Sequence, residues 1–302
     1  LHLASLYLTT GDTSYIRSTI LDGNENGYPL HIRSSDQNNK IANAKLSGFT
    51  IQNGRSINEK TGSGIRFEYA DSIRGDHLVI IDNISSGVGG GIRGAETNYA
   101  SFESVVIRNN TAIQGAGVYS EKVNIDLTNS IIKSNSLNGA SDGGGIYLVG
   151  YGDARFINCT VADNQIYDSR NGSGFAMNYW EHSDSVLFYN TIFANNKGVS
   201  GGLPGQIQLS SNNIAIVNTY TSTEGGDFSS IREQNNIYSI ADPFVSSNPE
   251  DQDMMNQNLD MVLADYSAAI GAGKSSIRFN GQTVTAPVTD FFGSSRPSSQ
   301  GS

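Results

Sequence analysis

Cysteine is nearly absent from this chain of 302 residues, because Cys159 is the only one. A single cysteine excludes an internal disulfide framework and a zinc site built from several thiolates. We expect this side chain to point inward as a small buried hydrophobe, which is how free cysteine usually behaves. A nucleophilic thiol would need a nearby histidine, and the sequence places none beside it.

Basic charge and long apolar runs are also scarce. The chain has 19 lysines and arginines against 29 acidic residues, which gives a formal net charge of −10 and a pI near 4.8. This balance argues against binding to nucleic acid or to an anionic membrane surface. No apolar run approaches the ~20 residues that span a bilayer, so we expect no membrane insertion.

Three other patterns are missing. No segment of ten or more residues has the 3.6-residue apolar period of a helical repeat. No glycine-rich phrase is followed by Gly-Lys-Ser/Thr, which excludes a P-loop. The stretch Asp22–Gly27 matches the first half of a calcium loop, but Arg33 stands where the loop needs a bidentate glutamate. We therefore expect a turn there and no metal site.

What the chain has instead is a glycine-rich phrase that recurs at a nearly fixed interval. Each phrase leads into an apolar residue, at Ile65, Ile92, Val118, Ile146 and Phe175. Between the phrases lie short β-branched strands that end in asparagine, at Asn83, Asn110, Asn135, Asn164 and Asn195. A period of this length indicates a solenoid built from stacked, equivalent coils.

The runs between the turns predict strands. They are short, rich in β-branched residues and closed by Gly, Asn, Asp or Ser. Stacked about 4.8 Å apart, they predict an all-β fold: a single-stranded right-handed parallel β-helix of roughly eight or nine coils with an irregular C-terminal cap. The recurrent asparagine would tolerate positive φ at its turn and stack its amide along the column.

Several of these phrases resemble those of secreted bacterial right-handed parallel β-helix proteins. The resemblance is carried by Leu46–Gly54, the Gly-Gly-Gly-Ile phrases and Asn158–Asn164. That group includes polymorphic outer-membrane adhesins and β-helix polysaccharide lyases. The resemblance implies an extracellular or bacterial cell-surface location. It leaves the function open, because one scaffold carries enzymes, binders and passive stalks.

The period divides the chain into three regions. We expect the β-helix over residues 1–239, a capping segment over 240–297 and the start of a linker over 298–302. Within the second region Asp290–Pro297 resembles a closing phrase of the same group, D-x-x-G-x-x-R. A cap would cover the unpaired edge of the last coil. Because the first residue is not methionine and the tail is serine-rich, we expect these residues to belong to a longer chain.

Alternation along the strands predicts one candidate site. The residue after each core-facing position should face outward, which places Arg66, Arg93, Tyr119 and Tyr147 in one column. Arginine can bind a carboxylate or sulfate bidentately, and tyrosine offers a flat face to a sugar ring. The same residues also fit a ladder of long side chains that only stabilises the sheet.

A second candidate site follows the last glycine phrase. Tyr179 precedes Trp180, the only tryptophan, and His182 lies two residues further on. Trp180 would be a sugar platform, and His182 would serve as a general base near neutral pH. A tryptophan packed over a coil edge explains the same residues. The predicted ligand-binding set is therefore Arg66, Arg93, Tyr119, Tyr147, Tyr179 and Trp180.

Three functions remain open from the sequence. We favour a module that binds polysaccharide or a cell-surface glycan, as an adhesin does. The alternative is a polysaccharide lyase that catalyses β-elimination on a uronate-containing polymer, with Arg93, Tyr119, Tyr147 and His182 as its catalytic residues. Only the lyase would call for a cofactor, Ca²⁺, and the sequence lacks the compact acidic cluster that would hold it. The third function is a passive structural stalk.

Overall fold

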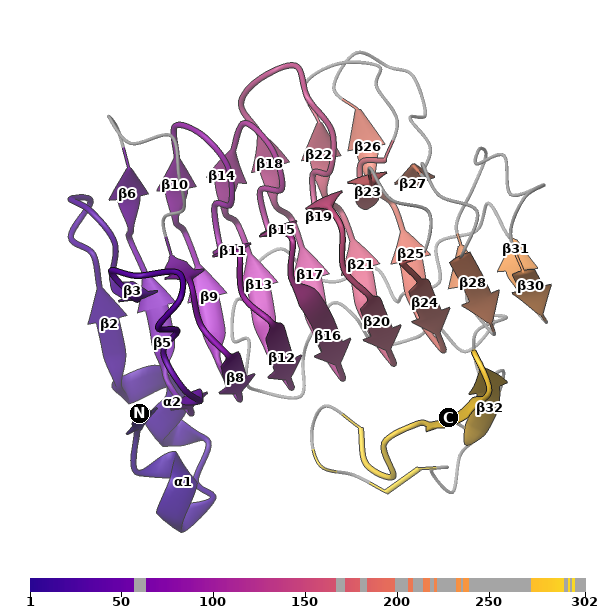
Figure 1. The fold of residues 1–302 in the computed structure, drawn as a ribbon, viewed down its shortest axis with the longest axis horizontal. Helices are drawn as coiled ribbons and strands as arrows, with labels where there is room; N and C mark the ends of the chain where they lie inside the picture. Colours follow the sequence, from indigo (N-terminus) through magenta and orange to yellow (C-terminus); the bar gives the residue numbers. More distant parts are fainter. Residues whose placement is uncertain are drawn as a thin grey trace.

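The structure is a computed structural model. It describes residues 1–56, 64–166, 172–179, 184–198, 206–208, 214–217, 220–221, 232–234, 236–238, 273–290, 293 and 295–296. Over these ranges the chain winds into an elongated parallel β-solenoid whose coils lie side by side (Figure 1). The predicted fold class is therefore confirmed. Within the same ranges, no helix has the length and apolar character needed to cross a membrane.

The solenoid has four parallel sheets, called A to D, and a complete coil visits them in the order D, A, B, C. Sheet A consists of β1 (His2–Ala4), β4 (Ala44–Ser47), β8 (Ser72–Asp76), β12 (Tyr99–Glu103), β16 (Asn124–Thr128), β20 (Ala154–Ile157), β24 (Val186–Tyr189), β28 (Ile214–Val217) and β30 (Arg232–Gln234). Sheet B consists of β2 (Ile20–Asp22), β5 (Thr50–Gln52), β9 (Val79–Ile81), β13 (Val106–Arg108), β17 (Ile131–Lys133), β21 (Thr160–Ala162), β25 (Ile192–Ala194), β29 (Tyr220–Thr221) and β31 (Ile237–Tyr238).

The other two sheets complete each coil. Sheet C consists of β6 (Arg55–Ser56), β10 (Ile84–Ser85), β14 (Thr111–Ala112), β18 (Ser136–Leu137), β22 (Gln165–Ile166) and β26 (Lys197–Gly198). Sheet D consists of β3 (Leu30–Arg33), β7 (Ile65–Glu68), β11 (Ile92–Ala95), β15 (Val118–Glu121), β19 (Ile146–Gly150), β23 (Phe175–Tyr179) and β27 (Ile207–Gln208).

The number of complete coils is smaller than predicted. Sheets A and B each have nine strands, but sheet C has only six, so six coils carry a strand in all four sheets over the described ranges. The prediction of eight or nine coils was wrong because it counted the partial coils at both ends. At the first end, α1 (Tyr7–Thr10) and α2 (Ser14–Ser18) take up the chain between β1 and β2.

The two short helices cover part of the outer surface of sheet B. Ile16 of α2 is fully buried and packs with Val79, Ile81 and Val106. The Thr50 hydroxyl donates a hydrogen bond of 2.8 Å to the Ile16 carbonyl. These contacts explain why apolar residues stand on the outward positions of β9 and β13.

The core fills the inside of the coils with aliphatic and aromatic side chains. The five residues predicted to face inward from the glycine phrases are all fully buried: Ile65, Ile92, Val118, Ile146 and Phe175. They occupy one register position in sheet D, as the period predicted. Phenylalanines stack further along the axis, with 5.1 Å between the ring centroids of Phe156 and Phe188. Burying each such ring contributes roughly 1.5–3 kcal/mol.

A ladder of buried asparagines runs along the corner between sheets B and C. The Asn110 Nδ2 donates to Asn135 Oδ1 at 3.0 Å, and Asn135 Nδ2 donates to Asn164 Oδ1 at 3.0 Å. Each amide also donates to a backbone carbonyl of the coil before it, as Asn135 does to Ile107 at 3.0 Å. The predicted stacking of amides is confirmed. The ladder consists of Asn83, Asn110, Asn135, Asn164 and Asn196.

The structure differs from the asparagine prediction in two ways. The last ladder member is Asn196 and not Asn195, because Asn196 accepts the Asn164 amide at 2.9 Å. The positive φ also belongs to the residue before each ladder position, so Asn195 at 54° belongs to a separate corner column. The sequence predicted that one asparagine would both adopt the positive φ and stack its amide, whereas the structure divides these roles between two adjacent residues. The positive-φ column consists of Asn53, Asp82, Asn109, Ser134, Asp163 and Asn195.

The glycine phrases and the asparagine ladder touch one another. A Cβ on Gly145 would lie 3.0 Å from the Asn164 Nδ2 and 2.5 Å from the Gly174 carbonyl oxygen of the next coil. Neither group can withdraw, because one belongs to the ladder and the other to the backbone. The two repeated motifs of the sequence are therefore the two sides of one packed corner.

The described part of the C-terminal region packs on the outer surface of sheet A. It forms an antiparallel hairpin of β32 (Ser276–Phe279) and β33 (Gln282–Thr285), beside β24 in Figure 1. Val284 is buried against Leu187 and Tyr189, and the Tyr189 hydroxyl donates to the Lys274 carbonyl at 2.6 Å. Residues 240–272, which begin the predicted capping segment, lie outside the described ranges.

The ladder predicts a large cost for its interruption. Asn135→Leu should lower the free energy of unfolding by at least about 2 kcal/mol, because it removes the hydrogen bonds that Asn135 makes with the buried Ile107 carbonyl and the buried Asn110 backbone N–H. Urea unfolding followed by circular dichroism measures this change. Asn138→Leu is the matched control, since Asn138 is exposed in the same coil and its replacement should cost less than about 0.5 kcal/mol. Equal stabilities of the two variants would contradict the structural role of the ladder.

Candidate functional site

The predicted column of outward residues is formed on sheet D. Arg66 pairs in register with Arg93, Arg93 with Tyr119, and Tyr119 with Tyr147. The pairing extends the column to His31 at one end and to Ala176 and Gln208 at the other. Alternation and period therefore located these side chains relative to one another.

Three of the four predicted residues are nevertheless largely closed to solvent, while Arg66 is half-buried. Arg93, Tyr119 and Tyr147 are only 9%, 8% and 7% exposed. The loops that lead from sheet C into sheet D lie over them: Val88 packs against the two tyrosines, whose ring centroids are 6.0 Å apart. A Cβ on Gly143 would lie 2.6 Å from the Tyr147 Cβ, so the covering is tight. A sugar ring has no open path to either phenol face.

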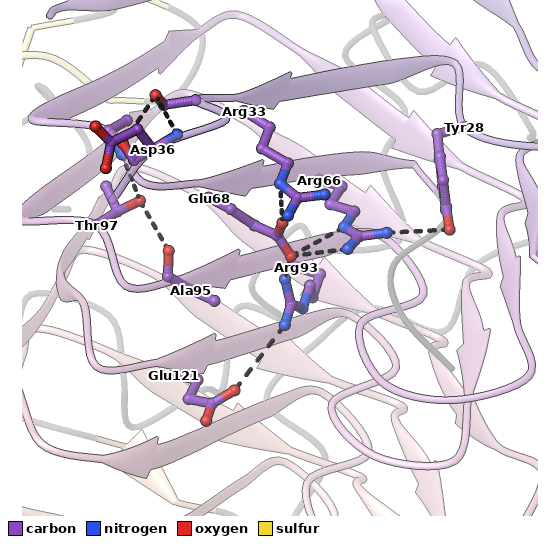
Figure 2. Close-up of polar contacts among 11 residues, drawn as sticks. Tyr28, Arg33, Asp36, Arg66, Glu68, Arg93, Ala95, Thr97 and Glu121 are labelled. Atoms are coloured by element: carbon purple, nitrogen blue, oxygen red, sulfur yellow. Dashed lines mark hydrogen bonds and ion pairs between the residues drawn. The ribbon is translucent and has the colours of Figure 1, made fainter. Parts of the chain in front are cut away.

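The arginines at the head of the column surround a buried carboxylate, Glu68 (Figure 2). Arg66 donates to Glu68 Oε1 from Nε at 3.1 Å and from Nη2 at 2.9 Å, and Arg93 Nη1 contacts the same oxygen. Arg33 Nε lies 3.3 Å from the other oxygen, Oε2. Glu68 therefore already occupies the place beside these arginines that the carboxylate of a uronate ligand would take.

Two further residues complete this cluster. Tyr28 accepts a hydrogen bond of 3.1 Å from Arg66 Nη1, and its ring centroid lies 5.4 Å from the Arg66 guanidinium carbon. Glu121 Oε2 lies 4.0 Å from Arg93 Nη2. Burial and the neighbouring Arg66 charge lower the pKa of Arg93. A guanidinium in that position depends on Glu68 and Glu121 for its stability.

The phenols of the column are poor general bases. Burial, followed by the Glu121 charge, raises the pKa of Tyr119 to about 12. Burial and the Asp142 charge also raise the pKa of Tyr147. A general base works best with a pKa near the operating pH. Both phenols stay protonated at neutral pH, which disfavours their role in proton abstraction from a uronate.

The second predicted site falls largely outside the described ranges. Tyr179 ends β23 and its backbone pairs with Gly150, but its side chain is not described. Trp180 and His182 lie in residues 180–183, which connect β23 to β24 and are also outside the described ranges. Their predicted roles remain predictions.

The described residues contain no group of three or more His, Cys, Asp or Glu side chains placed to hold a metal ion. Asp22, from the partial calcium loop, instead accepts hydrogen bonds from the side chains of Gln52 and Asn53, at 2.8 and 2.9 Å, and from the Asn24 backbone. These contacts form the turn that the sequence predicted.

An open groove lies at the corner where the chain passes from sheet D to sheet A. Its volume is about 250 Å³. Four coils contribute to it through equivalent connections, and Tyr151 on its wall is 42% exposed. The lining residues are Lys40, Glu96, Thr97, Asn98, Lys122, Asn124, Tyr151 and Gly152.

Polar contacts fix the side chains of this groove. Lys40 Nζ donates to Asn98 Oδ1 at 2.5 Å, and Asn124 Nδ2 donates to the Asn98 carbonyl at 2.9 Å. Lys122 Nζ donates to Glu96 Oε1 at 2.5 Å, and this carboxylate raises the pKa of Lys122. An exposed aromatic ring therefore stands among amide, ammonium and carboxylate groups, which together can donate and accept hydrogen bonds.

Sequence reasoning missed this groove. Lys40, Asn98, Lys122 and Tyr151 are far apart in the sequence, and each stands in an ordinary-looking turn. Aligning the connections that follow each outward column residue would have grouped them, because the strand register repeats from coil to coil.

Comparisons of the chain with protein-family models, with curated proteins and with solved structures found no match. The solenoid fold agrees with the resemblance noted in the sequence. The comparisons give no support for membership of the adhesin or lyase group.

The Arg–Glu68 cluster predicts a stability effect. Glu68→Gln should lower the free energy of unfolding by about 3 kcal/mol, because it leaves buried guanidiniums without their anion. Urea unfolding checks this value. Glu103→Gln, at an exposed position of β12, is the control and should change stability by less than about 0.5 kcal/mol. A neutral effect of Glu68→Gln would show that the arginines do not need this carboxylate.

The buried phenol predicts a pH effect. The folded state favours neutral Tyr119, so the stability that it contributes is complete below pH 10 and is lost as the pH rises through about 12. Wild type should lose stability relative to Tyr119→Phe over this window, as measured by urea unfolding at a series of alkaline pH values. Parallel profiles of the two proteins would contradict the raised pKa.

Proposed function

We propose that this chain is an extracellular or cell-surface module that binds polysaccharide or a cell-surface glycan without altering it. The observation that carries the proposal is the groove at the D-to-A corner, with the exposed ring of Tyr151 set among polar side chains. An exposed aromatic ring offers a flat face to a sugar ring, and the polar side chains around it can bond the sugar's hydroxyl groups. The resemblance to bacterial β-helix adhesins supports the same proposal and the surface location.

The scaffold suits a binding role because the groove is preorganised. Its walls are short connections held between strands of sheets D and A, and Asn98 and Asn124 are already bonded to one another. A rigid wall loses little conformational entropy when a ligand binds. The groove has a volume of about 250 Å³ and is open, so a sugar chain bound there can continue into solvent.

The lyase alternative has weaker support. The arginines that would neutralise a uronate contact Glu68, and the two phenols of the column are buried and hold their protons at neutral pH. Incubation with uronate-containing polysaccharides, followed by absorbance of the unsaturated product, tests this alternative directly. A reproducible rise that disappears in Arg93→Ala or His182→Ala would establish the lyase and overturn the binding proposal.

The binding role predicts a localised loss. Tyr151→Ala should weaken retention on a bound polysaccharide about five-fold or more, because a stacking anchor typically carries about 1 kcal/mol. Affinity electrophoresis against a panel of neutral and acidic polysaccharides measures retention. Tyr151→Phe should retain binding, since it keeps the ring.

The control for that experiment is Tyr15→Ala, which removes a partly exposed tyrosine from α2 on the side of sheet B. Its retention should match wild type. Lack of retention on every polysaccharide of the panel, with the protein folded, would leave the passive stalk as the function.

A further inference from the structure

The charges around the groove are mixed and balanced. The lining residues include two lysines, Lys40 and Lys122, and one carboxylate, Glu96. One further carboxylate adjoins the lining, because Asp71 accepts a hydrogen bond from Asn98 Nδ2 at 3.2 Å. The immediate surroundings thus hold two cations and two carboxylates.

The cations are not arranged to receive an anion. Lys122 is neutralised by its contact with Glu96. Lys40 bonds the amide oxygen of Asn98, whose other end bonds the Asp71 carboxylate. A uronate or sulfate entering the groove would have to compete with Glu96 for Lys122 and would approach Asp71. The chain as a whole carries a net charge of −10, which adds a long-range repulsion.

Repulsion of this kind grows with each charged unit of a polymer. Like charges close together near a protein surface repel one another, and salt screens part of this repulsion. A neutral sugar avoids this cost. Its hydroxyl groups donate to carboxylates such as Glu96 and accept from Lys40 and from the amides of Asn98 and Asn124.

We propose that the groove lined by Tyr151, Lys40, Lys122, Glu96, Asn98 and Asn124 binds a neutral polysaccharide, and that carboxylate-bearing polymers are excluded. One sugar ring lies on Tyr151, and its hydroxyls bond the polar side chains of the groove. This inference rests on the proposed glycan-binding function and names the ligand class for it.

The decisive comparison uses one backbone in two charge states. Homogalacturonan in its methyl-esterified and de-esterified forms is run in affinity electrophoresis beside a neutral β-glucan, mannan, xylan and galactan. We expect retention on at least one neutral polymer, little dependence on salt, and loss of about five-fold or more in Tyr151→Ala. De-esterified homogalacturonan should retain the protein at least about ten-fold less than its esterified form if the latter is bound.

A charge-reversing variant gives a second readout. Glu96→Gln combined with Asp71→Asn removes two carboxylates and releases Lys122, so it should gain salt-sensitive retention on de-esterified homogalacturonan. Glu103→Gln combined with Asp82→Asn, which removes two exposed carboxylates outside the groove, is the control for net charge and should show no gain.

These outcomes distinguish failure of the neutral-ligand inference from failure of the proposed glycan-binding function. Retention on an acidic polymer that is lost in Tyr151→Ala overturns the neutral-ligand inference and leaves glycan binding intact. Retention on a neutral polymer that Tyr151→Ala does not change overturns the assignment of the groove. Retention on nothing overturns both.

Discussion

The buried asparagine ladder is the interaction on which the rest of the solenoid depends. Each amide is hydrogen-bonded to the coils on either side, as Asn135 is to Asn110 and Asn164, so every coil is held at the same height and in the same register. A buried amide without partners is costly, which makes slippage of one coil against the next unfavourable. The glycine column beside the ladder leaves room for these amides, because a Cβ on Gly145 would meet Asn164.

A fixed register turns each outward position into a column along the axis. On sheet D the preceding loops cover Arg93, Tyr119 and Tyr147, and Glu68 contacts Arg66 and Arg93. At the corner between sheets D and A the connections are short and leave a groove. The same stacking therefore produces a face that stabilises the solenoid and a corner that is open to a ligand.

The distribution of charge connects this architecture with the proposed role. Buried arginines contact an internal carboxylate, so their charge is used in holding the coils together. The open groove keeps mixed, mutually bonded groups around Tyr151. Binding of an uncharged glycan would use this arrangement without breaking an ion pair, whereas acid–base chemistry on a uronate would need a free cation and a deprotonated base.

The sequence by itself determined the fold class, the inward residues and the order of the sheet D column, because period and alternation are local properties of the chain. It did not determine the number of complete coils, since the chain between β2 and β3 forms no strand in sheet C and the helices α1 and α2 are inserted between β1 and β2, where they pack on sheet B. Nor did it place Asn196 in the ladder, because the residue whose amide stacks and the residue with positive φ are adjacent in the sequence and both are asparagines here. The tertiary structure alone decided that loops cover Tyr119 and Tyr147 and that Lys40, Asn98 and Tyr151 line one groove. Those outcomes depend on the paths of loops from different coils, and the residues of a loop do not specify the neighbours beside which stacking places it.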